Sequence, residues 1–210
     1  MTRPRFTLGH DEINAFMRVN AHATLRFMEA GDDYVAARCL ILNYFIPGFP
    51  LFSQSVEKML KAMYFLETGQ PLRFKKNADM HNPFLIKQEL SKHRDFGLDH
   101  YDDLLKRLHG HYQVRYYENK GQSRGMGSGE IHEFDALWWE LFEKLQIPIE
   151  IKYRNKFTTS LLDTEHNYFD TYRFWCLQQN KAFLPHFEEM KETHDALIDY
   201  LYPNRPKPNA

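Results

Sequence analysis

The sequence predicts an all-α protein. Apolar residues recur at three- and four-residue spacing through most of the chain, and glycines and prolines fall between those stretches. Only one short segment alternates with the two-residue period of a strand. Hydrophobic residues make up 43% of the 210 residues and aromatic residues 15%, so the chain has enough apolar material for a core, which excludes a disordered protein.

Five helices are expected in the first half of the chain, over residues 13–31, 34–46, 51–69, 83–90 and 99–112. Gly31 is expected to end the first helix, and Asp32 or Asp33 to cap the second, because short acidic side chains accept hydrogen bonds from the free amides of a first turn. Gly69 is expected to end the third helix. Asn82 is expected to cap the fourth, with proline at its first position.

Helical spacing resumes after the glycine-rich segment 121–129. The expected helices of the second half cover residues 131–145, 161–183 and 187–201. Residues 146–153 carry three alternating isoleucines and are expected to form a short strand or an extended connection, and Pro185 separates the last two helices. Aromatic pairs such as Trp138–Trp139 lie in an acidic part of the chain and are expected in the core or at an oligomer interface, rather than stacked on bases.

Charge and cysteine content narrow the class of protein. The formal net charge is -1, so the whole chain does not predict a polyanion partner, although residues 73–125 carry eleven basic and seven acidic residues. The two cysteines, Cys39 and Cys176, are too few for a disulfide framework and predict a cytoplasmic protein. No apolar run approaches the roughly 20 residues that cross a bilayer, so we expect no membrane association.

Four segments carry a family resemblance. They are the helix containing Ala37–Leu40, the run Ser53–Ala62 with its Glu-Lys-x-x-Lys-Ala pattern, the segment Met80–Leu85, and the leucine-rich stretch Leu104–Tyr112 that leads into Arg115-Tyr116-Tyr117. In this order they resemble the HEPN domain, a small antiparallel helical bundle, over about residues 34–117. The run Arg115-Tyr116-Tyr117, at the end of the last segment, is similar to the Arg-Tyr branch of that family, which is regarded as lacking the nuclease motif.

The resemblance implies a domain organisation. We expect a HEPN-like bundle with an N-terminal helix over residues 1–120, a glycine-rich loop over 121–129, a C-terminal helical extension packed on the bundle over 130–202, and a flexible tail over 203–210. In the expected bundle, Glu57, Lys58 and Lys61 lie on the polar face of their helix, where they form either a simple exposed charge pattern or the lining of a groove.

Many HEPN proteins are metal-independent ribonucleases with an Arg followed by a His four to six residues later. A cation stabilises the charge that develops on phosphorus, and a His exchanges protons near neutral pH. The Arg that fits by position is Arg115, and no His follows it at that spacing. Arg94 with His100, or Arg115 with His111, remain as weak catalytic candidates. We expect no metal site and no cofactor.

The first interpretation is therefore a non-catalytic helical module that binds a nucleotide, RNA or a partner protein. The residues expected to bind nucleotide or nucleic acid are Lys58, Lys61, Arg115, Tyr116 and Lys120. The alternatives are a metal-independent endoribonuclease of toxin or defence type and a purely structural interaction domain. A homodimer is also expected.

Overall fold

The computed structural model describes residues 5–45, 47–113, 130–154, 156–162 and 170–204. These residues form helices and connecting segments and contain no β-strand, so the prediction of an all-α fold is confirmed. The α-helices are α1 (His10–Val19), α2 (Ala21–Leu42), α3 (Gly48–Thr68), α4 (Pro83–Ser91), α5 (Asp102–Gln113), α6 (Ile131–Lys144), α7 (Ile149–Lys152), α8 (Lys156–Leu162), α9 (Asp170–Leu177) and α10 (Phe187–Leu201). Short 3-10 helices are η1 (Asn77–His81), η2 (Asp99–Tyr101) and η6 (Leu184–His186).

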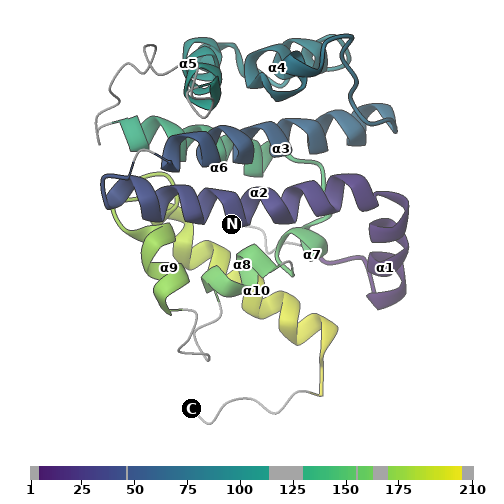
Figure 1. The fold of residues 1–210 in the computed structure, drawn as a ribbon. Coiled ribbons are helices and arrows are strands. Elements are labelled where there is room, and N and C mark those ends of the chain that lie inside the picture. Colours follow the sequence, from purple (N-terminus) through teal and green to yellow (C-terminus); the bar gives the residue numbers. More distant parts are fainter. Residues whose placement is uncertain (1–4, 46, 114–129, 155, 163–169, 205–210) are drawn as a thin grey trace.

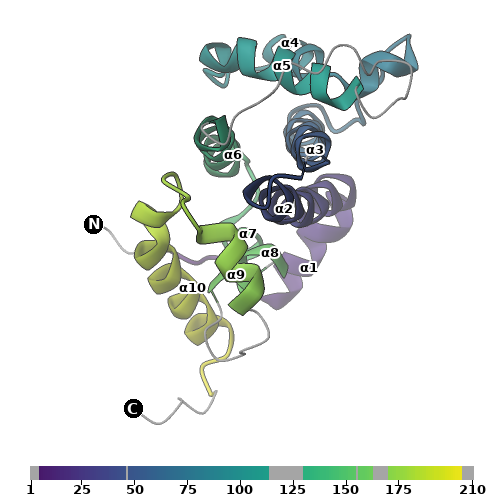
Figure 2. The same ribbon diagram turned by 60° about the vertical axis from the view of Figure 1, so that its left-hand side comes forward.

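The long helices α2 and α3 form a helical hairpin at the centre of the molecule (Figure 1). The short connection after Leu42 makes the two helices neighbours along their length. Helices α4 and α5 pack on one side of α3, and α6 lies beside α3 between that pair and α2 (Figure 2). Helices α8 and α9 pack against α2 on the opposite side. The hairpin is therefore covered on both sides.

The C-terminal helices share one hydrophobic core with the hairpin. Trp138 of α6 is fully buried, and its ring stacks on Tyr34 of α2 with centroids 4.5 Å apart. Phe157 of α8 and Phe183 lie within 6 Å of the Trp138 ring. The expectation that aromatic residues of this half pack in the core is met at these positions, because the two halves bury their rings against each other.

A buried polar network lies beside these rings. We call Tyr34, Arg38, Asp135 and Asn180 the core network, and all four are fully buried. The Tyr34 hydroxyl donates to Asp135 Oδ1 (2.7 Å) and accepts from Asn180 Nδ2 (2.8 Å). The Arg38 guanidinium donates to the Asp135 carboxylate and also to backbone carbonyl oxygens of the C-terminal region. The network therefore links α2, α6 and the segment around α9.

Gly31 does not end a helix, contrary to the prediction. Helix α2 continues through Gly31 to Leu42, and the boundary between the first two helices lies earlier, between Val19 and Ala21. A Cβ at Gly31 would lie 2.7 Å from Phe157, so the glycine permits close packing of α8 on α2. Asp33 is consequently inside the helix, where it pairs with Lys58 instead of capping.

The C-terminal half also differs in part from the prediction. Residues 149–152 form the helical turn α7, so the first alternative, a strand, is wrong, and no described strand is available to pair with it. Residues 145–148 form the non-helical connection that leads into α7. The single helix expected over 161–183 is too long, because α9 ends at Leu177, and residues 163–169 lie outside the described part of the chain. Cys176 is buried, and Cys39 is partly exposed.

Several local predictions are confirmed. Gly69 ends α3 with φ of 68°, a left-handed conformation that glycine adopts without strain. The Asn82 side chain accepts hydrogen bonds from the amides of Phe84 and Leu85 at the start of α4. Helices α5, α6 and α10 cover the residues expected for them. Among the described helices, none has the length and apolar character needed to cross a bilayer.

Candidate functional site

A polar cluster lies where α3, η1 and α5 meet, and we call Glu57, Lys61, His81 and Tyr112 the His81 cluster. Lys61 Nζ donates to Glu57 Oε1 at 2.7 Å. His81 Nδ1 lies 3.1 Å from Glu57 Oε2, and the His81 ring stacks on Tyr112 with an interplanar angle of 12°. Glu57 and Lys61 are nearly buried, whereas the His81 side chain is 46% exposed. The cluster therefore opens to solvent through His81.

The local sequence explains how these side chains meet. Glu57 and Lys61 are four residues apart in α3, so they project from the same face of the helix. His81 is the last residue of η1, and the Asn82 cap that follows begins α4 immediately. Tyr112 is the second-last residue of α5, which packs against α3. Three separate elements thus position one histidine.

The expectation for Glu57, Lys58 and Lys61 needs correction. Glu57 and Lys61 do not lie on an exposed polar face: they form a nearly buried ion pair, because α5 and η1 cover this side of α3. Lys58 is more exposed and pairs with Asp33 at 2.8 Å. Both candidate lysines therefore already have carboxylate partners within the fold.

A basic loop directly precedes η1. Arg73, Lys75 and Lys76, which we call the basic loop, are exposed, and no described residue forms an ion pair with any of them. Between them Phe74 packs on the core, and its amide donates to the sulfur of Met80 at 3.3 Å. That contact folds the loop back on η1. Three cations without an acidic partner among the described residues are thus tied, through Met80, to the segment that ends at His81.

The predicted catalytic pair Arg94 and His100 is engaged elsewhere. Arg94 pairs with Glu67 at the end of α3 (3.2 Å) and lies over the Phe96 ring. His100 Nε2 lies 3.2 Å from Glu140 of α6. Two different carboxylates on two different helices hold these side chains. No described contact joins Arg94 to His100.

His111 is the other histidine among the catalytic candidates. Its ring stacks on Phe49 with centroids 5.1 Å apart, and burial together with the nearby Arg107 lowers the pKa of His111. Two residues earlier in α5, burial also lowers the pKa of His109. Both imidazoles therefore favour the neutral form. Arg115, Tyr116 and Lys120 lie outside the described residues.

In the sequence, His81 stood out only as part of the segment Met80–Leu85 of the family resemblance, and the basic loop was not among the predicted site residues. The signal was present: three cations within four residues, separated by one aromatic residue and followed five residues later by a histidine. The contact between Phe74 and Met80 brings these features together, and no residue spacing predicts it. The described residues contain no group of three or more metal-ligating side chains.

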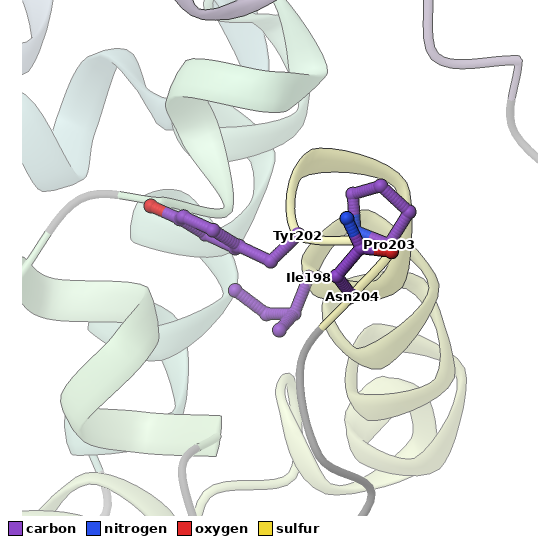
Figure 3. Close-up of a pocket in the computed structure, with 4 residues that line it drawn as sticks. All are labelled: Ile198, Tyr202, Pro203 and Asn204. Atoms are coloured by element: carbon purple, nitrogen blue, oxygen red, sulfur yellow. The ribbon is translucent and has the colours of Figure 1, made fainter.

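A shallow groove of about 540 Å³ lies at the end of α10 (Figure 3). Ile198, Tyr202, Pro203 and Asn204 line it, and none of the residues proposed from the sequence is among them. Comparisons of the chain with protein-family models, with curated proteins and with solved structures find no match.

Proposed function

We propose that this protein is a HEPN-like helical module that binds the phosphates of a nucleotide or RNA without cleaving them. The observation that carries the proposal is the basic loop, whose three exposed cations have no acidic partner among the described residues and which contacts Met80, the residue before His81. Elsewhere in the fold, cations such as Lys58 and Lys61 are paired with carboxylates. Unneutralised cations gathered in one place favour a polyanionic ligand.

The packing of the four resembling segments supports the HEPN-like assignment. They lie on α2, on α3, across η1 and α4, and on α5, and these helices contact one another in that order. The Glu and the second Lys of the Glu-Lys-x-x-Lys-Ala pattern meet the His of the next segment in one cluster. A resemblance spread along the sequence thus corresponds to one place in the fold.

The absence of cleavage is proposed because the predicted catalytic side chains have other roles. Glu67 holds Arg94, and Glu140 holds His100. A metal-independent nuclease needs an Arg or Lys and a His that reach one phosphodiester together. The contacts of Arg94 and His100 connect separate pairs of elements and do not direct both groups to a common point.

The test is fluorescence anisotropy with a labelled single-stranded RNA over a series of salt concentrations. We expect the triple variant Arg73→Ala, Lys75→Ala, Lys76→Ala to bind more weakly than the wild type. If all three cations meet phosphates, the slope of log K against log salt should fall in magnitude by about 2. The matched control removes three cations from other elements, in α1, after α9 and in α10: Arg18→Ala, Lys181→Ala, Lys191→Ala.

The control separates a site from a general charge effect. Equal losses in both triple variants would show that net charge alone governs binding, and would contradict a site at the basic loop. No binding by folded wild-type protein at low salt would contradict the proposed function as a whole.

A second candidate function follows from the contact between Glu57 and His81. A carboxylate that accepts from His81 Nδ1–H leaves Nε2 as a proton acceptor directed away from Glu57, which is an arrangement suited to general acid–base catalysis. Lys61 supplies a neighbouring cation. The candidate is a metal-independent ribonuclease in which His81 is the base. RNA cleavage in excess EDTA that the wild type performs and His81→Ala does not would favour this candidate.

A further inference from the structure

We propose that the exposed face of the His81 ring is a stacking platform for one nucleobase, so that the ligand is an unpaired nucleotide of a single strand. The inference rests on the proposed function and names the part of the ligand that the phosphate contacts leave open. The exposed face of His81 would bind the base, whereas the basic loop would bind only the phosphates.

The environment of the His81 ring determines which surface is free. Tyr112 covers one face at a centroid distance of 5.1 Å, with the two rings nearly parallel. Glu57 occupies the Nδ1 edge. Since the side chain is still 46% exposed, the remaining surface consists of the opposite face and the Nε2 edge. A flat aromatic surface backed by a second ring is the kind of platform on which bases stack.

The platform is also rigid. Tyr112 is buried to 5% exposure, and Glu57 and Lys61 hold each other within the same cluster. A ring fixed on one face by Tyr112 and along one edge by Glu57 loses little conformational freedom when a base covers its other face.

The distance to the nearest phosphate-binding cation suits a nucleotide strand. Lys76 precedes the first residue of η1 and His81 is its last. Five residues at the rise of a 3-10 helix separate them by about 10 Å. A flexible lysine side chain shortens that gap, so a base on His81 and a phosphate of the same strand on the basic loop can be bound together. A duplex cannot use the platform, since its bases are already stacked and paired.

The experiment measures the binding of four labelled or competing ligands to the wild-type protein. They are a single-stranded RNA decamer, the same decamer annealed to its complement, an abasic ribose-phosphate decamer and AMP. We expect the single strand to bind about 5- to 100-fold more tightly than the abasic strand, which is the range for stacking one base. We expect His81→Ala to leave the affinity for the duplex unchanged, because paired bases do not reach the platform. AMP binding as tight as that of the decamer would overturn the single strand as the ligand and identify a free nucleotide instead.

Two substitutions separate stacking from charge and from acid–base chemistry. His81→Ala should reduce the affinity for the single strand to that for the abasic strand. His81→Phe should keep most of the affinity, because a phenyl ring stacks but neither carries charge nor exchanges a proton. Thermal unfolding of both variants verifies the fold, and the exposed position of His81 makes the phenylalanine variant tolerable.

The failures can be told apart. If His81→Ala binds the single strand as the wild type does while the basic-loop triple variant does not, the platform is wrong and phosphate binding stands. Equal affinity of the wild type for the abasic and normal strands would also overturn the platform alone. If His81→Phe is as weak as His81→Ala, the histidine acts through its hydrogen bonds and stacking is wrong. If neither strand binds the wild type, the proposed function itself fails.

Discussion

The core network and the His81 cluster are both buried groups of charged and aromatic side chains, yet they differ in how completely the fold encloses them. In the core network, Arg38 and Asp135 have no solvent exposure, and protein partners meet the guanidinium on three of its nitrogens. In the His81 cluster, the buried pair of Glu57 and Lys61 contacts a histidine whose side chain is 46% exposed.

This difference indicates separate roles. A buried charge is tolerated when every polar group around it is bonded, and such a network fixes how elements pack. The core network bonds Arg38 to carbonyl oxygens of Trp175 and Gln178 and so holds the C-terminal region on α2. In the His81 cluster, the histidine ring stacks on Tyr112 and is still 46% exposed, and the nearby basic loop has no ion-pair partner among the described residues. The first cluster is expected to determine stability and the second to determine binding.

The largest expected effect is on stability, from Asp135→Ala. This change leaves the Arg38 guanidinium buried without its counter-ion, and the free energy of unfolding should fall by about 3 to 5 kcal/mol. Urea unfolding measures it. Asp103→Ala is the control, because the Asp103 side chain is 94% exposed and should change stability by less than about 0.5 kcal/mol. A loss below about 1 kcal/mol for Asp135→Ala would contradict the role given to the core network.

The buried Lys152 provides a second test, because its burial makes the free energy of unfolding depend on pH. Its ammonium donates to the Phe142 carbonyl oxygen at 2.7 Å, and burial lowers the pKa of Lys152 to about 8. The unfolded chain binds that proton up to about pH 10.5. Between these values the unfolded state holds more protons, so this group's contribution to stability increases as pH rises.

Lys152→Met removes that dependence. Relative to the variant, the wild type should gain about 2 kcal/mol of unfolding free energy between about pH 7.5 and about pH 9.5, measured by denaturant unfolding at each pH. Comparing the two proteins cancels other groups that titrate in this range. Lys181→Met, at an exposed lysine, should give a flat difference. A flat difference for Lys152→Met as well would mean that water reaches the ammonium.

How much of this was predictable depends on whether the signal was local. The Gly69 end of α3 and the Asn82 cap of α4 follow from neighbouring residues, and both predictions are confirmed. Gly31 was misinterpreted because its role is set by Phe157, which lies 126 positions later and nearly touches the site of a Cβ. Propensity alone cannot distinguish a glycine that ends a helix from one that admits a distant ring.

The same limit applies to the candidate site. The four-residue spacing of Glu57 and Lys61 predicted that they would pair, but not that α5 and η1 would bury the pair. Arg73, Lys75 and Lys76 are visible in the sequence as a charge run, a pattern that most often belongs to an ordinary solvated surface. Only the packing of Phe74 against Met80 places that run beside His81, and this contact depends on tertiary structure.

Glu57→Gln should have the smallest effect on stability of the changes at buried charges. It tests most directly whether the His81 cluster differs from the core network. The amide keeps an acceptor for Lys61 and loses only the charge, so the free energy of unfolding should fall by about 1 to 2 kcal/mol, less than for Asp135→Ala. Glu89→Gln, at the exposed pair with Lys92, is the control and should be near zero.

We expect Glu57→Gln to change RNA affinity in the opposite direction to its effect on stability. Removing a carboxylate beside the basic loop should leave the affinity for single-stranded RNA equal or higher in the anisotropy assay, because one source of repulsion toward phosphate is lost. A stability loss as large as that of Asp135→Ala, together with lost binding, would show that the His81 cluster is a second structural network. If Glu57→Gln binds RNA as the wild type does but has lost an EDTA-resistant cleavage, Glu57 positions His81 for acid–base catalysis. The reason is that phosphate binding gains when this negative charge is removed, whereas a catalytic Glu57–His81 pair needs the charge.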